Sequence, residues 1–584
     1  MLALQVNVDT EVNDKVRYAV DPRQKVLLDP GETMFSPMAI KRLREDWPGM
    51  FRSQLLHLIP VGKLAENFHP TLGCPTKELY SMAGAIFLKE FFNLTIEQTV
   101  ERYLFDSQWH YALNIVPNMA SISHASVERY ARLFVEDGLA TEVFQRVTSA
   151  LIEVLDLDVS RQRLDSTHVF SDMATFGRSK LMGVVSKRFL TQLKRHHPQG
   201  YDALPQPLQD RYAPSQASLF GDFKGTRKQL RQVIAEDLLW LVNHFAEDQA
   251  VIGRTSYQAM VRVLREQCQV SQDKTAVELK AKPGVETMVN PSDPDATYDG
   301  RKGQGYQAQI AETCSPSNDA QLITAVQVEP AHCSDQDAVE PMLDQLEAHG
   351  RKPEKLVADT GYGSDRNVVG AEARGVDLQS PVGGKPPSDE GQLTLKDFVI
   401  EPSNETVSRC PNGCQPLSSA HDQQAGKTTT FMRQSDCSRC ALRHRCPVKP
   451  SRGRFVLRHT PTERRLASRR AEQATDAFRK NYAIRAGAES LNSGLKRKTG
   501  MGRLRTRGRP RVGMAVLLRC AGWNLFRALA AMKKRNKRAA AAATGILCHI
   551  LFASVRLRAA VAFRETFRGR SPRRAAPASA LAAA

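Results

Sequence analysis

Four residues near the C-terminal end carry the sharpest chemical pattern of the chain. Tyr482, Arg485, Glu489 and Lys496 follow one another at intervals of three, four and seven residues in NYAIRAGAESLNSGLKRKTG. On a helix these offsets place all four side chains on one face. A carboxylate among two cations and a phenol is either part of a surface ion-pair ladder or a metal ligand flanked by groups that hold phosphates. The surrounding charge helps to decide, because a ladder should balance its charges.

Positive charge is concentrated in the last fifth of the chain. The net charge is +20, and residues 479–527 hold 13 Lys and Arg against the single acid Glu489. Residues 533–584 hold another 12 against Glu565, so the rest of the chain is close to neutral. A basic segment on a near-neutral body indicates a polyanion such as nucleic acid as partner. We therefore favour the phosphate-holding interpretation for residues 479–527, and a non-specific charged segment for the extreme tail.

Two aspartates form a second candidate group. Asp165 in RQRLDSTHVF and Asp359 in EKLVADTGYG each stand at the end of a predicted strand. Neighbouring carboxylates repel unless a cation neutralises them, and hard oxygen ligands suit Mg²⁺ or Mn²⁺. A strand-end aspartate is also a common turn or cap residue. Taken alone, the two aspartates leave a metal site and a structural role equally open.

Cysteines gather in a third group. Cys410 and Cys414 are separated by three residues, Cys437 and Cys440 by two, and Cys446 follows shortly after. In a reducing compartment two such pairs are typical of a structural, tetrahedral Zn²⁺ site. The alternative is a set of loop cysteines without metal. The predicted zinc ligands are Cys410, Cys414, Cys437 and Cys440, and Cys446 is able to replace one of them.

Strands and helices must position these groups, and their order is informative. The pattern of residues 161–170 predicts a strand that runs into a turn. Apolar alternation and short buried runs predict further strands over residues 306–313, 322–330, 356–359 and 376–382. A helix is predicted over residues 335–350, so the order favours an α/β fold with a mixed sheet. Upstream, helical patterns cover residues 75–92, 96–105 and 125–138, and Thr95 with Gln98 predicts a capping-box start for the second of them. They fit a helix-turn-helix DNA reader or, more commonly, a plain helical bundle.

Several of these stretches resemble a known family. LDSTHVFSDMATFGR, NPSDPDATY, VADTGYGS and residues 482–496 are similar to bacterial insertion-sequence transposases of the DDE class, in the group with a Y-x2-R-x3-E-x6-K signature. The stretch HPTLGCPTKELYSMAGAIFLKEFFNLTIEQTVE is similar to that family's N-terminal domain, and the resemblance covers most of residues 30–535.

The resemblance implies an RNase-H-like catalytic core and a set of roles. Asp165, Asp359 and Glu489 would bind metal, and Tyr482, Arg485 and Lys496 would hold DNA near the transposon end. Two Mg²⁺ ions, for which Mn²⁺ can substitute, would activate water and later a 3′-hydroxyl, and would stabilise the leaving oxygen.

The implied activity is metal-dependent strand cleavage and strand transfer of an insertion sequence. The implied partners are double-stranded DNA, both the element's terminal inverted repeats and the target, and further copies of the chain assembled on that DNA. Two alternatives are a non-catalytic DNA-binding relative and an RNase-H-like nuclease without strand transfer.

The predicted organisation has three parts, since 584 residues exceed what a single core can hold. Residues 1–150 form an N-terminal helical, DNA-binding region with its core at 66–138. Residues 151–535 form the catalytic domain, with a helical insertion at about 185–285 and a Cys-rich insertion at about 400–455.

Residues 536–584 form a basic Ala/Arg-rich tail that we expect to be disordered. The N-terminus lacks a signal-peptide pattern, and the weakly apolar run at 539–555 is too short to span a membrane. A cytoplasmic protein that associates with DNA and not with a membrane is therefore expected.

Overall fold

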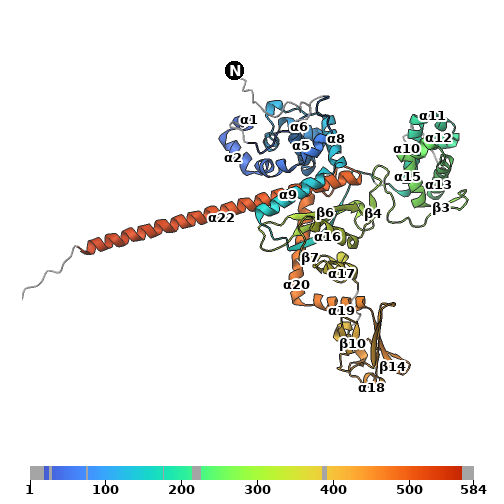
Figure 1. The fold of residues 1–584 in the computed structure, drawn as a ribbon. Helices are drawn as coiled ribbons and strands as arrows, with labels where there is room; N and C mark the ends of the chain where they lie inside the picture. Colours follow the sequence, from blue (N-terminus) through green and yellow to red (C-terminus); the bar gives the residue numbers. More distant parts are fainter. Residues whose placement is uncertain are drawn as a thin grey trace, which may run out of the picture.

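A mixed six-stranded sheet lies at the centre of the molecule (Figure 1). The computed structural model describes residues 19–24, 29–73, 76–174, 176–212, 225–384 and 391–568. The strands of the sheet are β1 (Arg161–Val169), β4 (Thr297–Asp299), β5 (Gly303–Thr313), β6 (Ile323–Pro330), β7 (Lys355–Ala358) and β8 (Asp377–Gln379). They run in the order β4-β5-β1-β7-β8, and β6 pairs with β5.

Strand directions make this sheet mixed. β5 is antiparallel to β1, β4 and β6, whereas β7 is parallel to both β1 and β8. The parallel strands are connected through helices, as parallel pairing requires. The structure thus confirms the expected α/β class with mixed pairing.

Helices cover both faces of the sheet. On one face lie α9 (Leu139–Leu155) and α22 (Arg509–Arg568), and the core there includes Tyr306, Ala308 and Ile310 of β5. On the other face lie α16 (Val339–Ala348) and α17 (Asp365–Ala373), whose core includes Ala311 of β5. The alternation read from the sequence of β5 therefore corresponds to two buried faces.

The N-terminal helices share the first of these cores. Their main members are α5 (Leu79–Phe91), α6 (Ile96–Phe105) and α8 (His124–Glu136), and α6 begins with the expected capping box of Thr95 and Gln98. The shorter ones are α1 (Pro30–Thr33), α2 (Pro37–Glu45), α3 (Trp47–Met50), α4 (Val61–Glu66) and α7 (Ser107–Ala112). Because α5 packs directly on α22, this region is continuous with the sheet's core.

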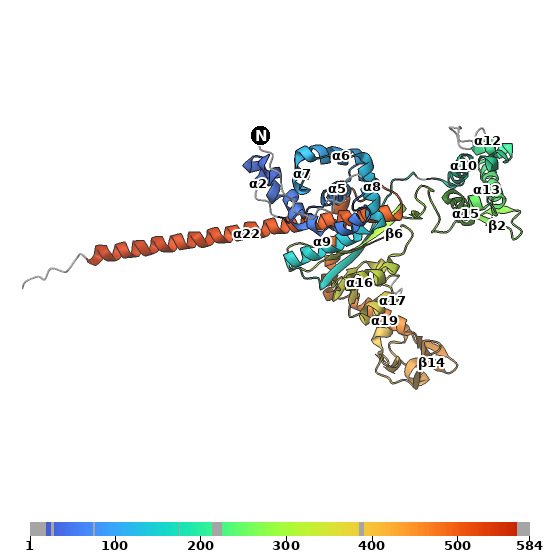
Figure 2. The ribbon, with the colours of Figure 1, turned by 45° about the horizontal axis from the view of Figure 1, so that its top comes forward.

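A helical lobe is inserted between β1 and β4, and Figures 1 and 2 show it set apart from the sheet. Its elements are α10 (Arg178–His196), α11 (Pro198–Asp202), α12 (Gln206–Tyr212), α13 (Arg227–His244), α14 (Gln249–Ile252), α15 (Thr255–Gln267), β2 (Cys268–Val270) and β3 (Val277–Leu279). The lobe has its own hydrophobic core, which includes Phe189, Leu238 and Met260.

A small β lobe lies between β8 and α19 (Pro461–Gln473). Its elements are β9 (Val399–Glu401), β10 (Thr406–Arg409), β11 (Ser418–Asp422), β12 (Lys427–Met432), α18 (Gln434–Ser438), β13 (Lys449–Ser451) and β14 (Arg454–His459). Two bidentate arginines on α19 connect this helix to the β lobe and to α17. Arg464 donates to Glu405 of the lobe at 2.7 and 2.8 Å, and Arg465 donates to Asp365 of α17 at 2.7 and 3.0 Å.

The four-residue signature does not lie on one continuous helix, which corrects the sequence expectation. Tyr482 ends α20 (Asp476–Tyr482), and Arg485 lies in the 3₁₀ turn η8 (Ala483–Ala486). Glu489 and Lys496 belong to α21 (Gly487–Thr499). The change of helical pitch coincides with Gly487, whose position beside Arg163 leaves no room for a β-carbon.

The C-terminal helix α22 corrects a second expectation. It continues to Arg568, so residues 536–568 are helical, while residues 569–584 lie outside the described residues. Alanine and arginine are strong helix formers, which favours continuation of a helix that the core has already nucleated. The part Arg509–Ala541 is long and apolar enough to cross a membrane, but 67% of its most apolar stretch is buried within the protein, as in a core helix.

Candidate active site

Strand register brings Asp165 and Asp359 to the same level of the sheet. Leu164 of β1 pairs with Ala358, the last residue of β7, so the two aspartates are the next residues along parallel neighbours. Asp165 itself lies in the middle of β1, which continues to Val169 against β5. The expectation that both aspartates end their strands thus holds for Asp359 only. β1 continues beyond Asp165, but its parallel pairing with β7 stops at Leu164, because β7 ends at Ala358.

Arg485 connects all three predicted acidic residues. One of its terminal nitrogens, Nη2, lies 3.5 Å from Asp165 Oδ1 and 3.8 Å from Asp359 Oδ2. The other, Nη1, lies 3.3 Å from Glu489 Oε1. Three carboxylates from β1, the end of β7 and α21 therefore converge on one guanidinium. We call these four residues the carboxylate cluster.

The carboxylates of the cluster differ in their access to solvent. The side chain of Asp165 is 13% exposed, that of Asp359 37% and that of Glu489 72%. Burial raises the pKa of Asp165, and Arg485 opposes this rise while Asp359 adds to it. Asp165 is thus the fixed, interior member of the cluster, and Glu489 is the member open to solvent.

Side chains outside the signature hold the cluster in place. Asn492 of α21 donates to Asp165 Oδ2 at 3.1 Å. From β1, Arg161 donates to the Asn481 carbonyl at 2.9 Å and Arg163 to the Ile484 carbonyl at 3.1 Å. These two bonds fix the backbone on either side of Tyr482, directly before Arg485.

Arg163 is itself anchored, because it donates from Nε to the buried Glu312 at 2.8 Å. A β-carbon on Gly487 would lie 1.9 Å from Arg163 Nη1, so a larger residue at the start of α21 would displace this guanidinium. These supporting residues carried no signal in the sequence, since no spacing rule connects β1 with a segment more than 300 residues away.

The remaining signature residues flank the cluster. The Tyr482 ring stacks on Phe478 with centroids 5.6 Å apart, and burial raises the pKa of its phenol. Lys496 is exposed on α21 and lies near Lys302, whose Nζ donates to Ser166 Oγ at 3.2 Å. Lys302 thus contacts the residue that follows Asp165, and Lys496 lies near Lys302.

A second group of polar residues lies beneath the cluster and was also missed. Gln309 of β5 donates to Glu329 at 2.8 Å and to Asp335 at 2.9 Å, and it accepts a hydrogen bond from Tyr362. Asp335 is close enough to contribute to the raised pKa of Asp165. Its position just before α16 gave no signal in the sequence beyond that of a helix-capping acid.

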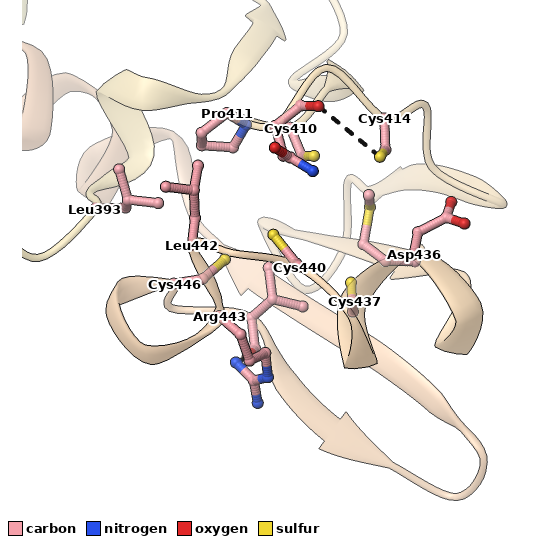
Figure 3. Close-up of a pocket in the computed structure, with 13 residues that line it drawn as sticks. Leu393, Cys410, Pro411, Cys414, Asp436, Cys437, Cys440, Leu442, Arg443 and Cys446 are labelled. Carbon is pink, nitrogen blue, oxygen red and sulfur yellow. Dashed lines mark hydrogen bonds between the residues drawn. The ribbon is translucent and has the colours of Figure 1, made fainter.

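The five cysteines of the β lobe line one pocket (Figure 3). Their side chains come from the turn after β10, from α18 and from the turns that follow it. His444, which follows the second cysteine pair, is exposed and does not line the pocket.

Comparison with known proteins gives one match. Residues 409–529 match a family described as a transposase DDE domain. This segment contains the five cysteines and all four signature residues, including Glu489, but neither Asp165 nor Asp359. No curated protein and no solved structure significantly matches the chain.

Proposed function

We propose that this chain, a DDE-class transposase by its match over residues 409–529, cleaves DNA and transfers the cut strand at the carboxylate cluster. The convergence of Asp165, Asp359 and Glu489 on Arg485 carries the proposal. Carboxylates that meet from separate elements are what metal-dependent phosphoryl transfer requires. An RNase-H-like arrangement of the sheet is part of the same proposal.

The donor set fits a divalent cation. Carboxylate oxygens are the ligands that Mg²⁺ and Mn²⁺ prefer. In the described residues no three His, Cys, Asp or Glu side chains already have metal-binding geometry, and here the positive charge comes from Arg485. When bound, Mg²⁺ supplies positive charge at the scissile phosphate and lowers the pKa of the attacking hydroxyl group.

The contacts of Arg485 with the acids are long enough for a metal ion to replace its guanidinium. Its contacts of 3.3 to 3.8 Å are longer than the 2.7 to 3.0 Å of Arg464 and Arg465, and its Nε is buried without a hydrogen-bond partner. An ion at the acids and the present position of this guanidinium exclude each other. We propose that Arg485 moves to a DNA phosphate when the site is loaded.

Each residue then has a defined task. Asp165, fixed by Asn492, and Asp359 would hold the cation at the sheet, and Glu489 would complete its ligands from the solvent side. Water attacks the scissile phosphorus, and the bond to the departing strand breaks to leave a 3′-hydroxyl. That hydroxyl attacks a target phosphate in the second step, and a bridging oxygen of the target leaves.

Cations beside the cluster would hold DNA. Lys302 contacts Ser166 next to Asp165, Lys496 lies near Lys302, and the chain from residue 479 onward is strongly basic. Such contacts bind phosphates irrespective of base sequence. As further parts of the proposal, the substrate is double-stranded DNA carrying terminal inverted repeats, copies of the chain assemble on it, and the protein acts in the cytoplasm.

A strand-cleavage assay tests the proposal. Duplexes would carry the DNA that flanks the coding sequence, with random duplexes for comparison, in Mg²⁺ or Mn²⁺. Asp165→Asn, Asp359→Asn and Glu489→Gln should each abolish cleavage and leave DNA binding intact. Glu340→Gln, on an exposed acid of α16 remote from the cluster, is the matched control.

The products separate the alternatives. Cleavage with joining to a target supports a transposase, whereas nicking without joining would indicate a plain nuclease. Binding without any cleavage by the unaltered protein would indicate a non-catalytic relative. Full activity in Asp165→Asn or Asp359→Asn would rule out the proposed site.

A further inference from the structure

The five cysteines of the β lobe form the second chemical cluster of the molecule. Cys410, Cys414, Cys437, Cys440 and Cys446 all line a cavity of about 20 Å³, which has room for a single water-sized group. Figure 3 shows their sulfurs turned toward one shared space. Thiols from three separate turns would not collect by chance around so small a cavity.

The lobe that carries them is too small to be held by its apolar residues alone. Its buried core consists of six side chains, namely Phe398, Val407, Met432, Val448, Phe455 and Leu457. Four of the five cysteines pack directly against that core. Units of this size usually need a disulfide or a metal in addition to a hydrophobic core. All five cysteines are free thiols in this structure.

We propose that the β lobe binds one structural Zn²⁺ through Cys410, Cys437, Cys440 and Cys446, with Cys414 at the rim. The lobe does not depend on the carboxylate cluster, so this inference is independent of the proposed function. It also differs from the ligand set expected from the sequence, in which Cys414 stood in place of Cys446.

The choice of ligands follows from the partners of the thiols. All five cysteines line the cavity, but the Cys414 thiol donates to the Asn412 carbonyl oxygen of its own turn at 4.0 Å. Cys414 therefore already has a partner within its turn and is the cysteine that we leave out of the zinc ligands.

Backbone turns present the thiols as zinc sites usually require. In the first turn the Gly413 amide donates to the Cys410 carbonyl at 2.9 Å, with Gly413 at φ 82°. In the second, the Cys440 amide donates to the Cys437 carbonyl at 3.4 Å. In the described residues no three such side chains already have metal-binding geometry, so Zn²⁺ would draw the sulfurs inward to bonds of ~2.3 Å.

The β lobe is bonded to α19, so a zinc ion in the lobe would have a structural role beyond the lobe itself. Glu405 of the lobe accepts two hydrogen bonds from Arg464 of α19, and α19 leads directly into α20 and the turn that carries Arg485. A rigid lobe would thus fix the start of the segment that delivers Glu489. The ion would have no part in the chemistry itself.

The test uses the full-length protein purified without chelator. Elemental analysis should find about one zinc per chain. Exchange with Co²⁺ should give the intense thiolate-to-cobalt charge-transfer absorption of a four-thiolate site. Cys437→Ser and Cys446→Ser should lose zinc, whereas Cys414→Ser should retain it. Cys333→Ser, on a half-buried cysteine outside the lobe, is the matched control.

Two results would overturn the proposal. One is unaltered protein without stoichiometric zinc. The other is a thiol titration of denatured protein that shows disulfides in the lobe. Zinc retained in Cys446→Ser and lost in Cys414→Ser would overturn the ligand assignment. The cobalt spectrum of the unaltered protein remains decisive even where a serine variant fails to fold.

Discussion

The carboxylate cluster and the cysteine cluster differ in how the repulsion between their ionisable groups is compensated. Each brings together groups that repel when ionised. In the carboxylate cluster the chain supplies its own cation, Arg485, and the sheet fixes Asp165 and Asp359. In the cysteine cluster the lining Arg443 donates to the Val448 carbonyl and lies over the Phe455 ring, and the supporting core is small. A site built on a large core keeps its shape without an ion, whereas a site on short turns depends on one.

The largest expected effect is a loss of strand cleavage without a change in folding. Asp359→Asn should lower strand cleavage on the order of 10³-fold, because a neutral amide cannot hold the cation that stabilises the transition state. Zinc content and circular dichroism should stay unchanged. Asp377→Asn, an exposed residue of the adjacent strand β8, serves as control. Loss of zinc in Asp359→Asn would show that the two clusters are coupled.

Removal of zinc by a chelator should instead disturb the structure of the β lobe. Treating the full-length protein with a zinc chelator should expose the β lobe to limited proteolysis within residues 391–459, with cutting accelerated about tenfold or more. The sheet and the helical lobe should remain protected, since each has its own core. Mass spectrometry of the fragments provides the measurement. Equal cutting of all parts would contradict the contrast between the two regions.

Replacement of Asn492 tests how strongly the carboxylate cluster depends on the side chains that hold it in place. Asn492→Ala removes the hydrogen bond to Asp165 and should lower cleavage by ~10–100-fold, as loss of a residue that orients a metal ligand usually does. DNA binding should not change. Ser493→Ala, on the neighbouring exposed residue, is the control. A mere loss of stability, with cleavage per folded molecule preserved, would show that Asn492 serves packing only.

Arg485 tests whether the chain competes with metal for its own acids. In DNA-free protein, Arg485→Ala should raise Mn²⁺ affinity by up to about tenfold, or ~1.4 kcal/mol, because the competing cation is gone. Isothermal titration calorimetry gives the affinity, and Arg497→Ala on the exposed side of α21 controls for net charge. Weaker Mn²⁺ binding would mean that Arg485 organises the acids instead of competing for them.

The smallest effect concerns stability and pH. The pKa of Asp165 is raised above its ordinary value of 3.8, chiefly by burial, so the folded protein binds this proton more tightly than the unfolded chain. Stability contributed by this group is therefore lost as pH rises through the folded-state pKa. Asp165→Asn should raise Tm by ~1–3 °C at pH 8 and have little effect below pH ~4. A lower Tm at pH 8 would mean that the ion pair with Arg485 outweighs burial.

Several features of the fold were predictable because they depend on local pattern. Period-two alternation gave the strands, and the capping box at Thr95 gave the start of α6. For residues 536–568 the prediction of disorder was wrong, because low sequence complexity hid a strong helix propensity continuing from a packed helix.

By itself the sequence determined which residue types are available and which neighbours along the chain act together: the spacing of Tyr482, Arg485, Glu489 and Lys496, and the pairing of the cysteines. Tertiary structure decided the rest. The register of β1 with β7 sets Asp359 level with Asp165, and Arg163 lies against Gly487 where α21 begins. These outcomes depend on register and close contact between segments hundreds of residues apart, whose energies no local pattern records.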